Sequence, residues 1–354
     1  MSVHVRRFII SLMASGWLLS VIAPSAEASC GSVSCFVVIG SQQQVPMAGL
    51  LIVNTIYNYT PMEAAPGQGG SIPFSNQGNQ TLTLANLHAN QIRTLMRTAI
   101  LDMNYGLTER FGLQVTLPYK QVNSDAQIGG LNPVPYSDKG LGDIRVSLKY
   151  NVLPTLRTMV VMGLGVDLPT GDYGQRVKGG SLAESTLQIG RGNFGLVPTL
   201  YQSYELIPHR LNLFALASYR HTFKNSDGYK FGDELNLSVG LNIIPLEQSP
   251  WLVLTQQVNY RWIQNDAMDA SLFQFNPATG SSILLDPTVK FRAVPTTGST
   301  YIAYSPGIML NLWDYASFYF ITQIPVVRDF NGNLEQQRSY VFGLTKTFQL
   351  LGGA

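Results

Sequence analysis

The most constraining feature of this chain is a two-residue alternation of apolar and polar side chains that recurs along almost its whole length. Residues 143–151 (Asp-Ile-Arg-Val-Ser-Leu-Lys-Tyr-Asn) carry an apolar side chain at every second position. Because successive side chains of a strand point to opposite faces, this pattern predicts a sheet with one apolar and one polar face. Such a sheet fits a soluble sandwich, whose apolar faces meet in a core, or an outer-membrane barrel, whose apolar face contacts lipid.

The first 28 residues have the pattern of a secretory signal peptide. Arg6 and Arg7 precede an apolar run over residues 8–23, and Ala26-Glu27-Ala28 is a small-x-small cleavage site. A single membrane anchor is the alternative, but the run is shorter than the ~20 residues that a spanning helix needs. We therefore expect export and cleavage after Ala28.

Composition separates the two kinds of sheet protein. Only 12% of the residues are charged, about half the usual fraction for a soluble domain. The 23 basic and 21 acidic residues give a formal net charge of +2, and no basic run indicates a nucleic-acid partner. No apolar stretch of spanning length follows the signal peptide, so a closed barrel is the remaining way to satisfy every backbone group in hydrocarbon.

Twelve segments show the strand alternation, and short turns alternate with long connections between them. This arrangement is typical of outer-membrane barrels, and segments of ~9–11 residues match a tilted membrane strand. We predict an all-β, antiparallel, up-and-down transmembrane barrel of about 12 strands in the outer membrane, in contact with lipid and with both termini in the periplasm. The expected strands are 50–59, 95–105, 111–119, 143–151, 160–168, 194–204, 211–219, 235–243, 252–262, 302–312, 316–326 and 338–348.

These boundaries predict three regions: a signal peptide over 1–28, a short periplasmic segment over 29–49 and the barrel over 50–354. The last strand alternates Tyr340, Phe342, Leu344 and Phe348. That alternation resembles the C-terminal signal by which the barrel-assembly machinery recognises its clients. We therefore expect this machinery as a partner.

The two cysteines of the chain, Cys30 and Cys35, lie within the short N-terminal segment. In an exported protein, a small disulfide loop is the favoured interpretation. Metal binding by the two thiolates is the alternative, but no further ligands lie nearby in the sequence. We predict no metal and no cofactor.

The polar face of the predicted strands would line the lumen. Its charged residues either form a hydrated path for solutes or pair across strands and plug the barrel. Twelve strands lie between side-chain-filled barrels of eight strands and open porins of sixteen, so both alternatives stay open. The lumen and selectivity candidates are Asp102, Lys120, Asp143, Arg145, Lys149, Asp167, Arg220 and Arg261.

An enzyme is a minor alternative, because the outer-membrane phospholipase is also a twelve-stranded barrel. Its His/Ser pair faces lipid on one strand. His221 is the candidate histidine here, but Phe223 stands two positions beyond it and Thr222 points to the other face. No nucleophile lies at a suitable spacing from a base, so we predict no catalytic residue.

Several segments together resemble a family of outer-membrane transporters named for association with meta-pathway phenol degradation, the MetA-pathway family. The resemblance implies a barrel and, by association, passage of hydrophobic or aromatic compounds. We therefore expect a passive channel for small solutes; the alternative is a plugged barrel with a structural, adhesive or anchoring role, holding a periplasmic partner near the N-terminal segment. The segments that carry the resemblance are 105–119, 140–150, 165–172, 323–327 with Asn331-Gly332, and 343–348.

Overall fold

The computed structural model describes most of the chain after the first 36 residues. The described residues are 37–64, 90–127, 134–155, 157–173, 188–226, 229–245, 251–268, 275–276, 281–282, 292–293, 297–313, 316–330 and 334–350. The predicted signal peptide, Cys30 and Cys35 lie outside these residues. Among the helices described, none is both long and apolar enough to span a membrane.

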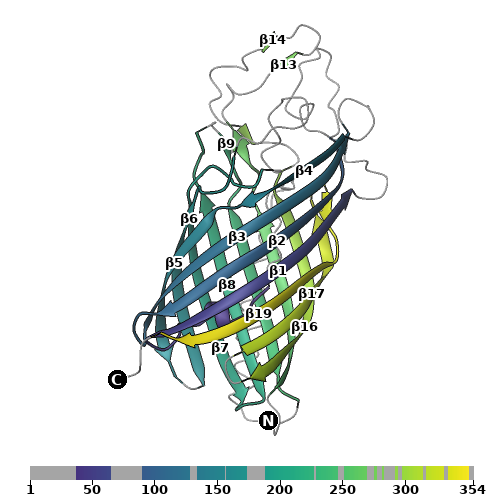
Figure 1. Ribbon diagram of the computed structural model, residues 1–354. Coiled ribbons are helices and arrows are strands. Elements are labelled where there is room, and N and C mark those ends of the chain that lie inside the picture. Colours follow the sequence, from purple (N-terminus) through teal and green to yellow (C-terminus); the bar gives the residue numbers. More distant parts are fainter. Residues whose placement is uncertain are drawn as a thin grey trace, which may run out of the picture.

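Twelve long strands form the wall of a closed barrel (Figure 1). Each of the twelve segments expected from the alternation lies on one of them, so the predicted fold class is confirmed. The wall strands are β1 (Leu50–Ala64), β2 (Asn90–Gly106), β3 (Phe111–Gln127), β5 (Ile144–Pro154), β6 (Thr158–Leu168), β7 (Gly195–Ile207), β8 (Leu211–Thr222), β10 (Glu234–Ile243), β11 (Leu252–Ile263), β16 (Ser299–Trp313), β17 (Ala316–Asp329) and β19 (Ser339–Gln349).

Every wall strand pairs antiparallel with its neighbours, and the first strand pairs with the last. Ile56 of β1 lies opposite Ile100 of β2 on one side and opposite Gly343 of β19 on the other. This pairing closes the sheet, which leaves no free edge in the wall. A closed barrel rather than a sandwich is therefore the correct interpretation of the alternation.

Exposure alternates along the wall as the sequence pattern predicts. On β5, Leu148 is 50% exposed while the neighbouring Lys149 is buried. Val239 on β10 and Val258 on β11 are each more than half exposed on the outer face. A wall that is apolar outside and polar inside is the pattern of a barrel surrounded by lipid.

The connections differ in length at the two ends of the barrel. At one end, here called the short-turn end, β2 turns into β3 over residues 107–110 and β7 turns into β8 over 208–210. The β1 start and the β19 end also lie there, where the Leu350 amide donates to the Gly49 carbonyl at 3.0 Å. The opposite end is here called the long-loop end. Which compartment each end faces stays a prediction.

The wall extends further at the long-loop end than the sequence indicated. A connection was expected over 123–142, but β3 continues to Gln127 and β4 (Val134–Leu141) pairs with it, Tyr119 lying opposite Leu141. Residues 123–127 and 134–140 lack the sustained apolar alternation of the other wall segments, so the sequence pattern did not mark this extension.

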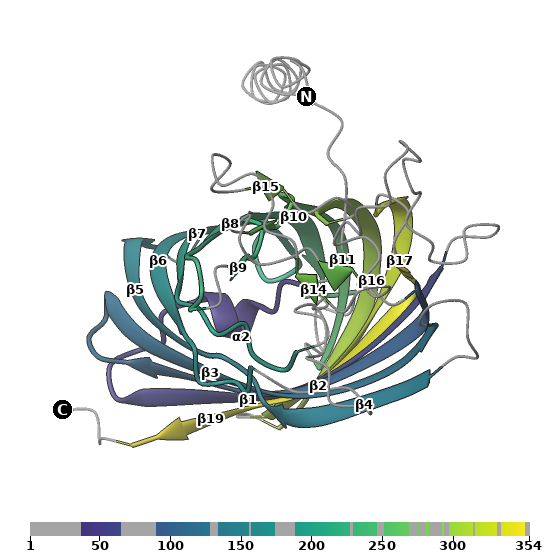
Figure 2. The same cartoon turned by 90° about the horizontal axis from the view of Figure 1, so that it is seen from above.

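The smaller elements lie at the ends or inside. Figure 2 shows the short helix α2 (Gly40–Gln43) within the ring of strands. Residues 37–48, here called the N-terminal plug, occupy the short-turn half of the lumen. The remaining short strands are β9 (Tyr229–Lys230), β12 (Ala267–Met268), β13 (Phe275–Asn276), β14 (Ser281–Ser282), β15 (Arg292–Ala293) and β18 (Leu334–Gln336).

Candidate functional site: the two halves of the lumen

The N-terminal plug is tied to strands around the whole wall. The Gln257 side chain of β11 both accepts from the Val38 amide and donates to the Val38 carbonyl, each at 2.9 Å. The Ser41 hydroxyl donates to Asn54 of β1 at 2.7 Å, and Asn104 of β2 donates to the Gln44 carbonyl at 2.7 Å. These partners are neutral, and most of them use the backbone groups that an extended segment leaves unpaired.

Two of the predicted lumen residues support this plug. Asp102 is fully buried and accepts from Asn54 at 3.1 Å and Gln114 at 2.6 Å. Lys149 is also buried and donates to the Gln42 carbonyl. Both charges therefore hold the plug or its partners in place and do not line an open path.

An apolar cavity of about 310 Å³ lies between the plug and the wall of the short-turn half. Val38 and Ile39 of the plug form part of its lining. Phe214, Tyr319 and Ile321 line it from the wall, each of them a buried side chain on the inner face. Glu205, His209 and Arg210 also line the cavity, so it is mainly rather than wholly apolar, which still departs from the polar interior of a water-filled porin.

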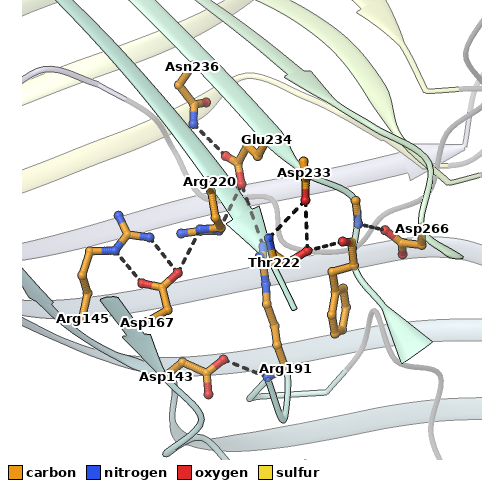
Figure 3. Close-up of polar contacts among 12 residues, drawn as sticks. Asp143, Arg145, Asp167, Arg191, Arg220, Thr222, Asp233, Glu234, Asn236 and Asp266 are labelled. Carbon is orange, nitrogen blue, oxygen red and sulfur yellow. Dashed lines mark hydrogen bonds and ion pairs between the residues drawn. The ribbon is translucent and has the colours of Figure 1, made fainter. Parts of the chain in front are cut away.

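The long-loop half of the lumen is closed by charged side chains instead. Figure 3 shows Arg145 paired with both oxygens of Asp167, at 2.6 and 3.0 Å. Arg220 bridges Asp167 and Glu234, with 3.0 Å to each carboxylate. These residues come from four strands, β5, β6, β8 and β10, with β7 between β6 and β8, and form one ion-pair network across the inner wall.

Residues 188–194, here called the inner loop, fold into the lumen next to this network. The two oxygens of Asp143 accept the backbone N–H groups of Gly171 at 3.0 Å and Arg191 at 2.8 Å. Lys120 donates to the Ile189 carbonyl at 2.9 Å. The Arg191 guanidinium then lies 3.9 Å from Glu234 and 5.3 Å from the centre of the Phe231 ring.

Arg261 lies apart from the network. It is buried, donates to Gln336 of β18 at 2.8 Å and packs 5.0 Å from the centre of the Tyr301 ring. Of the eight lumen candidates, five gather in the long-loop half: Lys120, Asp143, Arg145, Asp167 and Arg220. Asp102 and Lys149 lie at the plug, and Arg261 lies under β18.

Two residues of the network were not among the candidates. Arg191 lies in a connection, where the strand alternation does not predict which way a side chain points. The glycines on either side of it, Gly190 and Gly192, do indicate a tightly packed backbone. Gly192 has φ +65°, and a Cβ on Gly190 would lie 2.4 Å from the Gly171 carbonyl oxygen. Glu234 lies two positions before the inward-facing Asn236 on β10. The alternation of that strand therefore predicts that Glu234 also faces the lumen.

His221 lies near the long-loop end with a carboxylate as its partner. Its Nδ1 is 2.8 Å from Asp233, and its ring meets Phe223 edge to face. The Tyr219 hydroxyl donates to the same Asp233 oxygen at 2.8 Å. In the described part of the chain, the His221 ring contacts no serine or threonine hydroxyl, and no group of three or more His, Cys, Asp or Glu side chains could hold a metal ion.

Comparison with known proteins gives a family match and a fold match. The family model described as "Putative MetA-pathway of phenol degradation" matches residues 70–316. A search of curated proteins finds no sequence match to the chain. Among solved structures, the COG4313 outer membrane channel from Pseudomonas putida F1 is 12% identical with a TM-score of 0.61, and the alignment covers 88% of this chain and 100% of that one.

Two further structures align less closely. The monoaromatic hydrocarbon channel TodX is 10% identical with a TM-score of 0.44, over 86% of this chain and 91% of that chain. The toluene transporter TbuX from Ralstonia pickettii is 11% identical with a TM-score of 0.41, over 85% and 90%. The Pseudomonas putida channel establishes the fold, which is that of an outer-membrane β-barrel.

Proposed function

Since the chain belongs to this phenol-degradation family, we propose that it is a passive outer-membrane channel for small hydrophobic or aromatic solutes, without chemistry of its own. The apolar cavity in the short-turn half carries the proposal. Engineered apolar cavities of ~150 Å³ already bind benzene. The cavity here, at about 310 Å³, has room for a single-ring or fused two-ring aromatic compound.

In this proposal, the wall and the plug have different roles. The outer face of the barrel contacts lipid through apolar side chains such as Val239 and Val258. The plug fills part of the lumen and is held there by hydrogen bonds such as those between Val38 and Gln257. The mainly apolar cavity beside it favours hydrophobic solutes over sugars and ions, because polar solutes lose hydration there while gaining few partners.

Uptake by intact cells tests this function, because a lipopolysaccharide leaflet slows hydrophobic solutes. We expect cells that contain the barrel to take up labelled naphthalene faster than cells without it, at unchanged entry of labelled xylose. Val253 lines the apolar cavity, so Val253→Phe should fill it and slow naphthalene entry several-fold. Val239→Phe adds the same ring on the lipid-facing side and is the matched control. Naphthalene entry that does not depend on the barrel would overturn the proposal.

The second candidate function is a plugged barrel with a structural, adhesive or anchoring role. The observation in its favour is that both the N-terminal plug and the inner loop lie inside the lumen. This candidate predicts that no solute entry changes on deletion, while outer-membrane integrity or binding of a periplasmic partner does. Measuring naphthalene entry and detergent sensitivity in the same deletion strain separates the two functions.

Three expectations from the sequence accompany the proposal. The last strand, with Tyr340, Phe342, Leu344 and Phe348, presents the aromatic signal for the barrel-assembly machinery. Cys30 and Cys35 form a disulfide at the start of the mature chain, where a periplasmic partner could be held. Non-reducing peptide mapping of the exported protein tests the disulfide.

A further inference from the structure

We propose that a cavity in the long-loop half of the lumen binds a small aromatic monocarboxylate, its carboxylate at Lys120 and its ring against Met96, Ile100 and Pro118. The inference rests on the proposed channel function, because it names an ionised class among the aromatic solutes.

The cavity has two chemically different sides. It encloses about 190 Å³, above the ~150 Å³ that accommodates benzene. Met96, Ile100 and Pro118 form an apolar side. The opposite side carries four basic side chains and two acidic ones: Lys120, Arg145, Arg191 and Arg220 with Asp143 and Asp167.

The carboxylates of this half are already engaged. Asp167 is paired with Arg145 and Arg220, and Glu234 adjoins the cavity paired with Arg220. The two oxygens of Asp143 accept backbone N–H groups of the loops. Among the described residues, the four basic groups that line the cavity face two acidic ones in the lining and Glu234 beside it, which leaves an excess of one positive charge.

Lys120 is the cation that an added anion would meet. Within the described part of the chain, the contact of its ammonium is a neutral one, with the Ile189 carbonyl at 2.9 Å, whereas Arg145 and Arg220 each have carboxylate partners. An ammonium carries three donors, so two N–H groups stay available. Gly142 leaves room for the lysine stem, because a Cβ there would lie 3.1 Å from Lys120 Cε.

These features together select the ligand class. One excess positive charge is balanced by one negative charge, and a charge-assisted hydrogen bond in a low-dielectric lumen is stronger than a neutral one. The apolar side favours binding of a ligand that has an aromatic ring next to that charge, as benzoate does. Inorganic phosphate has no apolar part and would leave Met96 and Ile100 facing a hydrated ion.

Calorimetric titration of the full-length barrel in detergent micelles tests the charge preference. We expect benzoate to bind roughly tenfold or more tightly than its neutral counterpart benzyl alcohol, in line with the greater strength of charge-assisted hydrogen bonds. Inorganic phosphate should compete at least tenfold more weakly than benzoate. Equal binding of benzoate and benzyl alcohol would overturn the proposal, and phosphate competing as well as benzoate would overturn the aromatic class.

Substitution of the lysine locates the site. Lys120→Met keeps the apolar stem and should lower benzoate affinity roughly tenfold while leaving benzyl alcohol unchanged. Lys120→Arg should restore most of the affinity. Lys139→Met removes an exposed lysine of β4 and is the matched control, with no expected change. Equal losses in Lys120→Met and Lys139→Met would contradict the assignment.

The two proposals fail separately. If naphthalene enters through the barrel but benzoate binding does not depend on Lys120, the channel stands and this inference is wrong. If benzoate binding depends on Lys120 but no aromatic compound enters, the site stands and the channel function is wrong. Heat-modifiable migration on gels reports whether Lys120→Met forms the barrel; if it does not, the benzoate and benzyl alcohol affinities of the unmodified protein decide.

Discussion

The two halves of the lumen are closed by different physical means. In the short-turn half, most contacts of the N-terminal plug are with amide and hydroxyl groups, such as those of Gln257 and Asn104, and Lys149 adds one charged donor. In the long-loop half, charged side chains contribute more to holding the inner loop: Asp143 accepts the Arg191 amide and Lys120 donates to the Ile189 carbonyl, beside neutral bonds such as Asn193 to the Phe223 carbonyl. Neutral bonds are insensitive to salt and mild acid, whereas partly exposed ion pairs respond to both.

This difference indicates that the halves have separate roles. The short-turn half combines mostly neutral tethers with a mainly apolar cavity, and in our proposal its plug seals the lumen. The long-loop half combines ion pairs with a cavity of excess positive charge, and in our proposal it selects solutes by charge. One polar-inside pattern in the sequence thus supports two functions along a single lumen.

The largest expected effect comes from removing the seal. Deleting residues 37–46 should raise single-channel conductance in planar bilayers by roughly tenfold, because a twelve-stranded barrel without a plug has an interior wider than one packed with side chains. The unchanged wall gives the control, since heat-modifiable migration should persist. Unchanged conductance would instead make the charged half the limiting constriction and reverse the comparison.

A smaller change displaces the seal without removing it. A Cβ on Gly106 would lie 2.2 Å from the Met47 carbonyl oxygen, so Gly106→Ala must push the plug aside. We expect conductance to rise several-fold. Gly112→Ala is the matched control, because its Cβ would lie 3.3 Å from the end of the Val45 side chain, which can shift. Equal conductance of the two variants would contradict a seal at the Gly106 contact.

The charged half is tested at Asp143. Asp143→Asn removes the negative charge from two hydrogen bonds to the loops, each worth roughly 1.5–3 kcal/mol when charged. Asparagine keeps one acceptor oxygen, and its NH2 group cannot accept the second backbone N–H. We expect faster hydrogen exchange over residues 188–194 and about a twofold gain in conductance. Asp125→Asn is the control, because Asp125 pairs with Arg93 on an exposed surface. Unchanged exchange of the inner loop would show that contacts other than Asp143, such as Lys120 with the Ile189 carbonyl and Asn193 with the Phe223 carbonyl, hold it.

The smallest expected effect is a difference in acid sensitivity. Burial raises the pKa of Asp233, but hydrogen bonds from the Thr222 amide, His221, Lys230 and Tyr219 outweigh it and lower the pKa to about 2. A carboxyl whose folded pKa is depressed stabilises the fold above its unfolded pKa of about 3.9, and this contribution is lost as the pH falls towards 2.

Hydrogen exchange, corrected for intrinsic rates, should therefore rise over residues 229–235 between pH 4 and pH 2. Protection of the plug should change less in the same experiment, because the side chains of Gln257 and Asn104, which bind its backbone, carry no ionisable group. Equal loss of protection in both regions would contradict the division into a neutral half and a charged half.

The wall of the barrel was predictable from sequence because its cause is local. Lipid on one side and the lumen on the other impose a period of two, which each strand carries by itself, as Leu148 and Lys149 illustrate. The family also followed from ordered segments such as 105–119 and 140–150. The strand extension of β3 and the partner strand β4 escaped prediction because residues 123–127 and 134–140 lack a sustained apolar alternation.

The interior was less predictable because its contacts join residues far apart in the chain. The Val38 and Gln257 pair spans 219 positions, and Lys120 meets Ile189 across 69. No local period marks such contacts. The alternation correctly placed Arg145 and Asp167 on the inner wall, but it could not show that Asp167 also pairs with Arg220, nor that Arg191 enters the lumen from a loop.

The pairing of β1 with β19 has a consequence for how the molecule assembles. Every other pairing in the wall joins strands that follow one another in the chain, whereas Leu50 lies opposite Gln349. This seam has by far the longest loop to close and is the slowest contact to form. Residues 37–48 precede β1 directly, so they must already lie on the concave side of the growing sheet when the seam forms, or thread into a lumen that has closed.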